Sequence, residues 1–162
     1  MSFHHRVQQL GLTLPPAPAA AADYRVTNES HFTLYVSGQL PKTDDGQLLA
    51  TGKVGGAVDL ETARRCARQC ILNALSAIAA ELGGNFKQTF RQVVRLGVFV
   101  ASTPDFTDQH LVADAASGLL HEVLGPKGRH ARSAVGCASL PLDAPGEIEM
   151  TLELFDDRFE ND

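Results

Sequence analysis

The sequence lacks three features that would assign a chain of this size to a familiar class. Its three cysteines are odd in number and no pair has metal-finger spacing, so neither a disulfide framework nor a zinc finger is indicated. No apolar run reaches the roughly 18 residues of a membrane-spanning helix. No basic run occurs either, and 14 Lys and Arg against 19 Asp and Glu give a formal charge of -5. We therefore expect a soluble, cytoplasmic protein without general affinity for nucleic acid or membranes.

The 162-residue sequence does contain enough apolar material, 44%, for one domain with an adequate core. A chain of this size is expected to bury roughly 70% of its unfolded surface. Residues 1–22 predict an N-terminal arm with a short helix and an extended Pro/Ala-rich segment, residues 23–156 the domain itself, and residues 157–162 a polar tail. Cys66 and Cys70, four residues apart in an apolar stripe, predict buried structural thiols.

Two helices are predicted from apolar residues that recur at spacings of three and four. The first spans residues 59–82, with Asp59 as its N-cap and Gly83 at its stop. The second opens near Thr103 and ends near residue 124. Four strands are predicted from β-branched and aromatic content, at residues 24–28, 33–37, 48–53 (a minor one) and 89–101. The last is apolar enough to predict burial on both faces.

Two further strands flank a turn-rich segment near the end of the chain, and we predict that they are neighbours. Side chains in a strand alternate between its two faces. Arg132 and Ala134 therefore share one face, and Glu147 and Glu149 share a face of the next strand. The opposite faces, with Val135 on the first strand, are predicted to meet the core. Arg132 can then bind a ligand carboxylate or form a structural ion pair with either glutamate.

This order of elements predicts an α+β fold in which two helices cover one face of a sheet. The other face would expose Arg132, two glutamates and small side chains, so it requires water or a partner. Self-association is the partner we expect, because homo-oligomers usually close by rotational symmetry. The sequence shows no Ser/His/Asp set, phosphate-binding glycine loop or metal cluster, so we expect a site without metal or cofactor.

Several short motifs, in order and correctly spaced, make the sequence resemble one family. They are Val36-Ser37-Gly38-Gln39-Leu40-Pro41, Asn73-Ala74-Leu75, Pro104-Asp105-Phe106, Ala131-Arg132-Ser133 and Glu147-Ile148-Glu149. Over nearly the whole domain the chain resembles the Rid/YjgF superfamily of imine deaminases, also called endoribonuclease L-PSP or translation-inhibitor proteins. Its long N-terminal arm is similar to that of a less characterised branch. The resemblance implies a chorismate-mutase-like fold and a homotrimer with active sites in the clefts between subunits.

The resemblance also implies roles for individual residues. Arg132 matches an arginine that grips the carboxylate of a 2-imino or 2-enamino acid. Glu147 matches a glutamate that orients or activates the attacking water. Tyr24, Ser37 and Gly38 match positions that complete the pocket.

Two positions depart from the pattern of the deaminating members. His110 stands where an asparagine is typical, and Ala134 where a cysteine is common. We expect pairing with Arg132 to keep Glu147 ionised, with Glu149 in a supporting role in the pocket. The main hypothesis is hydrolytic deamination of imino acids to 2-keto acids and ammonia. The alternative is a trimeric protein that binds a small carboxylate without turning it over, and ribonuclease activity is least favoured because the chain is acidic.

Overall fold

The computed structural model describes residues 3–20, 22–83 and 86–155, so the predicted tail at residues 157–162 lies outside the described residues. The helices are α1 (Phe3–Gln9), α2 (Leu60–Leu82), α3 (Phe86–Thr89) and α4 (Gln109–Leu124), with short 3-10 helices η2 (Gly125–Gly128) and η3 (Pro141–Asp143). The strands are β1 (Thr27–Ser30), β2 (Thr33–Gln39), β3 (Phe90–Ala101), β4 (Ala131–Cys137) and β5 (Gly146–Leu154).

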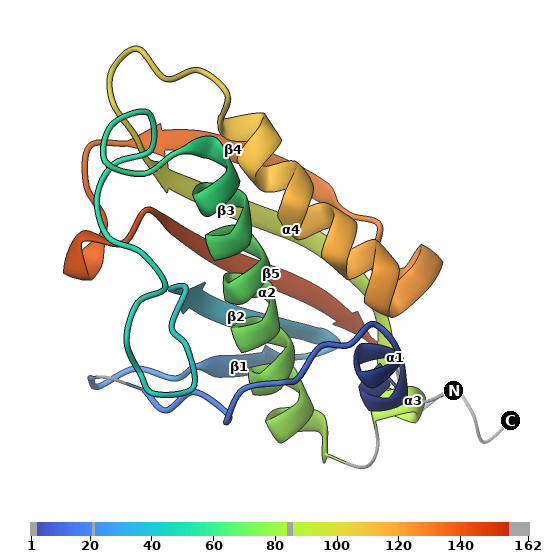
Figure 1. Cartoon of the computed structure of the whole chain (residues 1–162). Helices are drawn as coiled ribbons and strands as arrows, with labels where there is room; N and C mark the ends of the chain where they lie inside the picture. The colour runs from blue at the N-terminus through green and yellow to red at the C-terminus, as the bar shows by residue number, and fades with distance from the viewer. Residues whose placement is uncertain (1–2, 21, 84–85, 156–162) are drawn as a thin grey trace, which may run out of the picture.

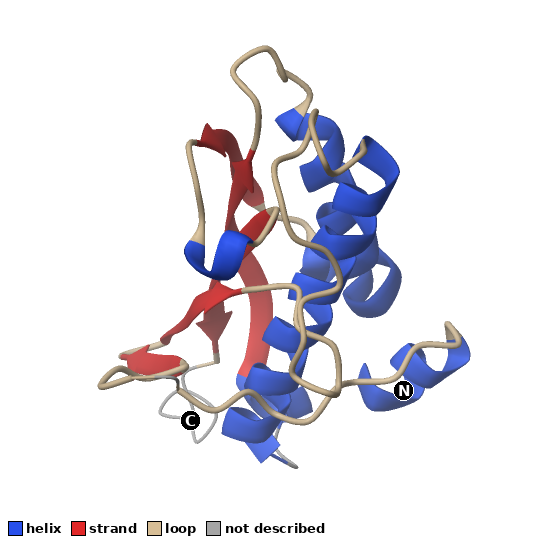
Figure 2. Cartoon of the chain, turned by 60° about the vertical axis from the view of Figure 1, so that its left-hand side comes forward, coloured by secondary structure: helices blue, strands red, loops and turns tan. Residues whose placement is uncertain are grey.

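The five strands form one sheet in the order β1-β2-β5-β3-β4. Neighbouring strands are antiparallel except β3 and β4, which run parallel. A parallel pair needs a crossover connection, and α4 supplies it between these two strands. Helices α2 and α4 pack against each other on one face of the sheet, as Figures 1 and 2 show from two sides. The predicted α+β fold with two helices on one sheet face is confirmed.

Helix α2 forms the centre of the core and has the predicted ends. Asp59 Oδ1 accepts a hydrogen bond from the Thr62 N–H at 2.7 Å, which satisfies a donor at the helix start. Gly83, at φ 55°, follows the last turn. Cys66 and Cys70 are 1% and 0% exposed, as predicted, and burial raises the pKa of the Cys66 thiol to about 11. A thiol so hard to ionise is a poor nucleophile, so these side chains serve packing.

The N-terminal arm is anchored along its length. Val7 of α1 is 1% exposed, and Leu12 and Leu14 pack against the core beyond it. Ser76 Oγ of α2 then donates a hydrogen bond to the Pro15 carbonyl oxygen at 2.6 Å. In Figure 1 the arm, drawn in blue, passes across α2 on its way to β1.

The second predicted helix begins too early. Helix α4 starts at Gln109, whereas the Phe106 N–H closes a turn by donating to the Thr103 carbonyl oxygen at 3.1 Å. The Thr103 N–H itself donates to the Val54 carbonyl oxygen at 3.0 Å. Pairing with a segment fifty residues earlier in the chain therefore keeps Thr103 out of the helix.

Three strand predictions also need correction. Strand β1 begins at Thr27, three residues later than predicted, which leaves Tyr24 in the preceding loop. Residues 48–53 form no strand and contain only an isolated bridge at Leu48. The N–H groups of Leu49 and Gly52 donate to carbonyl oxygens in two different segments of the chain, so no continuous strand pairing forms. Strand β3 is buried on both faces only toward its end, and Val94 is 43% exposed where the sheet has no helix over it.

The prediction that the strands of Arg132 and Glu147 are neighbours is wrong. Strand β3 lies between them, and its Leu96 pairs with Arg132 on one side and with Met150 of β5 on the other. The turn-rich segment between β4 and β5 therefore crosses a whole strand instead of closing a hairpin. Since neighbouring strands are about 4.8 Å apart, the backbones of β4 and β5 are about 10 Å apart.

Candidate functional site

Arg132 faces the helix layer and not the open face of the sheet, which corrects the prediction. Its register partner Leu96 is 0% exposed. Its Nη1 donates to Asp114 Oδ1 at 2.9 Å and to Ser117 Oγ at 3.0 Å, both on α4. Val135, predicted for the core, is 45% exposed. The prediction placed the small side chains that share a face with Arg132 on the open side of the sheet. Small side chains on an edge strand equally allow a helix to pack closely against that face.

One edge of the Arg132 guanidinium makes no hydrogen bond within the described chain. Within the described chain its hydrogen bonds both use Nη1, and its side chain is 24% exposed. The Nε and Nη2 atoms together form a planar edge that can bind a carboxylate through two parallel hydrogen bonds. Around it lies an open cavity of about 370 Å³, lined by Ser117, His121, Gly128, Arg129, His130 and Arg132.

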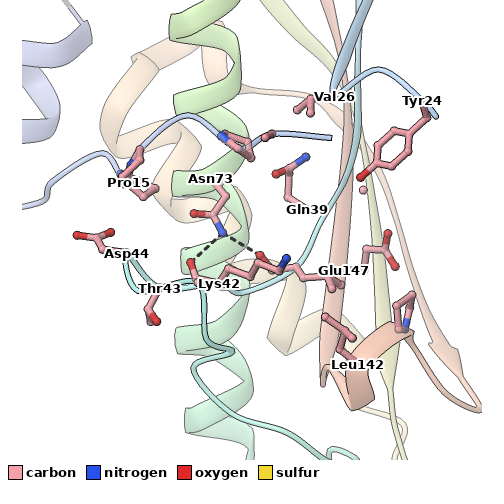
Figure 3. Close-up of a pocket in the computed structure, with 17 residues that line it drawn as sticks. Pro15, Tyr24, Val26, Gln39, Lys42, Thr43, Asp44, Asn73, Leu142 and Glu147 are labelled. Carbon is pink, nitrogen blue, oxygen red and sulfur yellow. Dashed lines mark hydrogen bonds between the residues drawn. The ribbon is translucent and has the colours of Figure 1, made fainter. Parts of the chain in front are cut away.

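Glu147 lies on the opposite face of the sheet and lines a second cavity. The residues of β5 alternate between buried and half-buried along the whole strand, as predicted, so its glutamates point away from the helices. The carboxylate of Glu147 shares a cavity of about 480 Å³ with Tyr24 and Gly38 (Figure 3). Three of the predicted site residues are therefore brought together within a single chain.

The electrostatic surroundings of Glu147 differ from the prediction. Arg132, which we expected to keep it ionised, pairs with Asp114 instead. Burial, and then repulsion from Glu149, raise the pKa of Glu147. Glu149 itself has a cation near it, Arg95 Nη1 at 3.4 Å. A partly buried carboxylate with a raised pKa and no ion pair in the described chain is suited to accepting and returning a proton.

Gly38 makes room for this carboxylate. A Cβ at that position would collide with Glu147 Oε1 and lie 2.7 Å from its Cδ. The pairing of β2 with β5 is also irregular here, because the register shifts between Val36 and Gln39. The glycine and the irregular strand together allow Glu147 to lie directly against the backbone of β2.

Besides Arg132, four predicted site residues do not line the cavity of Glu147: Ser37, His110, Ala134 and Glu149. Ser37 Oγ donates to the Arg25 carbonyl oxygen at 2.6 Å. His110 is exposed in the first turn of α4, and Ala134 is half-buried and packs against the core on the helix side of β4. Their roles in a pocket stay predictions.

The predicted site residues thus form two half-sites. The glutamate half-site consists of Tyr24, Gly38 and Glu147, and the arginine half-site consists of Arg132 and the cavity around it. Within one chain they lie on opposite faces of the sheet with β3 between them. A single small molecule cannot contact both Arg132 and Glu147 of the same subunit.

Sequence reasoning missed the other walls of the glutamate cavity. Asn73 of α2 lies on its floor, where Nδ2 donates to the carbonyl oxygens of Leu40 at 2.8 Å and Lys42 at 3.0 Å. A polar residue inside an apolar helix stripe was the available signal. The N-terminal arm contributes one side wall, formed by Pro15, Pro16, Pro18 and Ala19.

The described residues contain no metal site and no membrane-spanning helix. No group of three or more His, Cys, Asp or Glu side chains in this part of the chain is placed to hold a metal ion. Every buried side-chain nitrogen or oxygen that the structure describes has a hydrogen-bond partner. None of the described helices combines the length and the apolar character needed to cross a membrane.

Known proteins resemble this chain in both fold and sequence. The crystal structure of Atu1372 from Agrobacterium tumefaciens, a protein of unknown function, matches with a TM-score of 0.86 and 44% identity over 94% of both chains. Protein TCP17 of Trypanosoma cruzi is 43% identical over 149 residues, 91% of each chain. The mitochondrial protein Mmf1 of Saccharomyces cerevisiae is 30% identical over 134 residues, 83% of this chain and 77% of Mmf1.

The solved structures of Atu1372 and of yeast Mmf1 share this fold, with TM-scores of 0.86 and 0.56. Residues 15–153 also match the family model of endoribonuclease L-PSP. The chain belongs to the endoribonuclease L-PSP family, which confirms the resemblance to the Rid/YjgF superfamily.

Proposed function

We propose that this protein hydrolyses reactive 2-imino and 2-enamino acids to 2-keto acids and ammonia, in clefts between the subunits of a homotrimer. The observation that carries the proposal is the environment of Glu147. Its carboxylate lines a cavity of ligand size, its pKa is raised, and it forms no ion pair with the described residues. Membership of a family that contains imine deaminases supports the same activity.

The chemistry needs one proton carrier. Glu147 removes a proton from water, the water oxygen forms a bond to the imine carbon, and the C=N electron pair moves to nitrogen, which takes up a proton. Glu147 then carries the hydroxyl proton of the resulting carbinolamine to its amino nitrogen, so that the C–N bond breaks, ammonia leaves and the C=O bond forms. A positioned carboxylate typically contributes ~10²–10⁴-fold to such a reaction. The Tyr24 hydroxyl lies in the same cavity and would hydrogen-bond to water or substrate.

The arginine half-site would hold the substrate carboxylate, and a neighbouring subunit would supply it. Strand β4 is an edge strand, so Arg132 lies at the periphery of the sheet, where another subunit can approach. The open face of the sheet also exposes large apolar side chains, Tyr35, Val94 and Val135, that a partner would cover. In this arrangement each cleft combines Glu147 of one subunit with Arg132 of the next.

The direct test measures ammonia and keto-acid release from 2-imino acids that an amino-acid oxidase generates in the assay. Wild type should release both faster than buffer alone. Glu147→Gln and Arg132→Ala should each be close to the buffer rate, while Arg64→Ala, on the exposed surface of α2 and outside both cavities, should retain activity. Wild-type release no faster than buffer would contradict the deaminase proposal.

Mixing the two inactive variants tests whether the site is shared between subunits. Glu147→Gln and Arg132→Ala chains, unfolded together and refolded in equal amounts, should form mixed trimers. If every cleft takes one residue from each of two subunits, about one quarter of the clefts regain both wild-type residues. Activity near one quarter of wild type is therefore expected, whereas a site within one chain would show no recovery.

A second candidate function is binding of a small carboxylate without turnover. It is favoured by Ala134 and His110, which differ from the residues of deaminating members, and by the Nε and Nη2 edge of Arg132, which makes no hydrogen bond within the described chain. Calorimetry with 2-keto acids would then detect binding that Arg132→Ala abolishes, in a protein that shows no turnover. Ribonuclease activity is least favoured, because the glutamate cavity has one basic residue, Lys42, beside two acidic ones.

A further inference from the structure

The cavity of Glu147 has two ends of different chemistry. Figure 3 shows Tyr24 and Glu147 on one side and Pro15 and Asp44 well away on the other. The first end holds the reactive carboxylate and the phenol hydroxyl. The second end is walled by the N-terminal arm, through the side chains of Pro15, Pro16, Pro18 and Ala19, which we call the arm wall.

The arm wall is anchored to the core at its N-terminal end. The Ser76 hydroxyl donates to the Pro15 carbonyl oxygen at 2.6 Å, and both residues are buried. Two consecutive prolines fix φ at both positions and restrict the residue before each of them. On the N-terminal side, Leu12 and Leu14 pack against the core. A rigid wall of this kind selects ligands by shape, because it loses little entropy when a ligand binds.

The Asn73 side chain, which lies between the two ends, has partners within the chain on both its amide nitrogen and its oxygen. Both amide protons of Asn73 are donated to backbone carbonyl oxygens, and its Oδ1 accepts from Gln69 at 3.2 Å. Gln39 Nε2 donates to the Ser37 carbonyl oxygen at 3.0 Å. Groups satisfied within the chain gain little from a polar ligand, so this part of the cavity presents itself as an apolar surface.

The remaining charges lie at the rim and have opposite signs. Lys42 and Asp44 are both exposed, and they stand on the loop that borders the cavity. A ligand charge placed there would remain hydrated and be screened by salt, so it would gain little affinity. Neither a strongly acidic nor a strongly basic side chain is favoured by this rim.

We propose that the arm wall makes this site selective for 2-imino acids with large apolar side chains, aliphatic or aromatic. The inference rests on the proposed deamination at Glu147, and it adds the substrate class. The imine carbon lies at Glu147 and Tyr24, while the side chain extends along Val26 and Leu40 toward Pro16 and Ala19. A cavity of about 480 Å³ falls within the range of ligand pockets and leaves the smallest imino acids without contacts at the wall.

The experiment compares kcat/KM for imines formed in the assay from leucine, phenylalanine, alanine and glutamate. The leucine and phenylalanine imines should exceed the alanine and glutamate imines at least about tenfold, the usual minimum for several methylene groups in an apolar pocket. A parallel calorimetric series uses the stable keto acids 4-methyl-2-oxopentanoate, pyruvate and 2-oxoglutarate. The first should bind at least about tenfold more tightly than the other two.

The arm offers a matched pair of variants. Ala19 lines the cavity and Ala17 does not, although both are exposed residues of the same segment. Ala19→Trp should lower kcat/KM for the leucine imine about tenfold and leave the alanine imine within about twofold. Ala17→Trp should change neither value. Equal losses for both imines in Ala19→Trp would overturn the role of the wall.

The two readouts separate this inference from the proposed function. Turnover of all four imines with similar kcat/KM would overturn the selectivity and leave the deaminase standing. Absence of turnover together with the expected ranking of keto-acid affinities would overturn the deaminase and support the apolar class for a binding protein. Failure of all three keto acids to bind would overturn the inference.

Discussion

Strand β5 carries three glutamates on the same face, and their charged neighbours differ between the two ends of the strand. Glu153 Oε1 is 3.0 Å from Arg91 Nη1, and Glu149 Oε1 is 3.4 Å from Arg95 Nη1. Glu147, next in the alternation, has no such cation within the described chain and has a raised pKa. The same sequence pattern therefore yields surface ion pairs at one end and a candidate proton carrier at the other. The neighbouring strands decide which of the two forms.

The largest effect should come from removing the charge at the reactive end. Glu147→Gln should lower imine hydrolysis ~10²–10⁴-fold, because the water loses its general base. It should also raise the free energy of unfolding at neutral pH by about 0.5–1 kcal/mol. The sign follows from the raised pKa: the folded state holds the Glu147 proton more tightly, so wild type loses stability as pH rises above the ordinary value near 4.5.

The paired end supplies the control for this variant. Glu149→Gln removes the partner of Arg95 from an exposed ion pair, so stability should fall by less than about 1 kcal/mol. Urea unfolding and steady-state kinetics of both variants measure the contrast. Equal loss of activity in Glu149→Gln would show that the two ends of β5 are not functionally distinct.

A smaller effect is expected from displacing Glu147 without changing its charge. Gly38→Ala places a methyl group against the carboxylate, and a displacement of ~1 Å should cost about 10²-fold in turnover. Gly118→Ala is the control, because a Cβ at this position of α4 meets no atom within 4 Å. That variant should be fully active and more stable by about 0.5–1 kcal/mol. A fully active Gly38→Ala protein would argue against a positioned Glu147.

A weaker effect again should follow from changing the arginine half-site conservatively. Arg132→Lys keeps the charge but loses the planar edge, so affinity for a 2-keto acid should fall about 10- to 100-fold. Arg64→Lys, on the exposed surface of α2 and outside both cavities, should leave that affinity unchanged. Isothermal calorimetry gives both numbers. Unchanged affinity in Arg132→Lys would contradict the proposal that Arg132 binds the substrate carboxylate.

The smallest effect concerns the pH dependence of stability near Arg132. His130 Nδ1 is 2.7 Å from the Gly128 carbonyl oxygen and Nε2 is 3.0 Å from Ser117 Oγ. Burial, and then the charge of Arg132, lower the pKa of His130, although the Gly128 carbonyl opposes them.

The folded state therefore binds this proton less readily than the unfolded chain, so stability should fall as pH drops below the ordinary value near 6.5. His130→Gln should reduce the difference in unfolding free energy between pH 7.5 and pH 5.5, by about 1 kcal/mol or less. His121→Gln, exposed at the same cavity, should leave the wild-type difference intact. A wild-type curve without loss at acid pH would contradict the burial argument.

Local periodicity was enough to predict the main elements. The spacing of apolar residues in α2, with Asp59 before it and Gly83 after it, is confirmed, and so is the alternation along β5. Both signals depend on neighbours within a few residues, which the sequence displays directly. The glutamate of the candidate site could be placed on the correct face for this reason.

Long-range pairing decided what the sequence could not. Strand β3 lies between β4 and β5, and Asp114 is the ion-pair partner of Arg132. A backbone hydrogen bond to the distant Val54 carbonyl oxygen keeps Thr103 out of α4. A residue's place on its own element follows from backbone geometry, so the sequence by itself determined that Arg132 and Glu147 stand on strands of an α+β domain. Which strands adjoin, and which charges meet, depends on contacts between distant segments, so only the tertiary structure separated these two residues into half-sites.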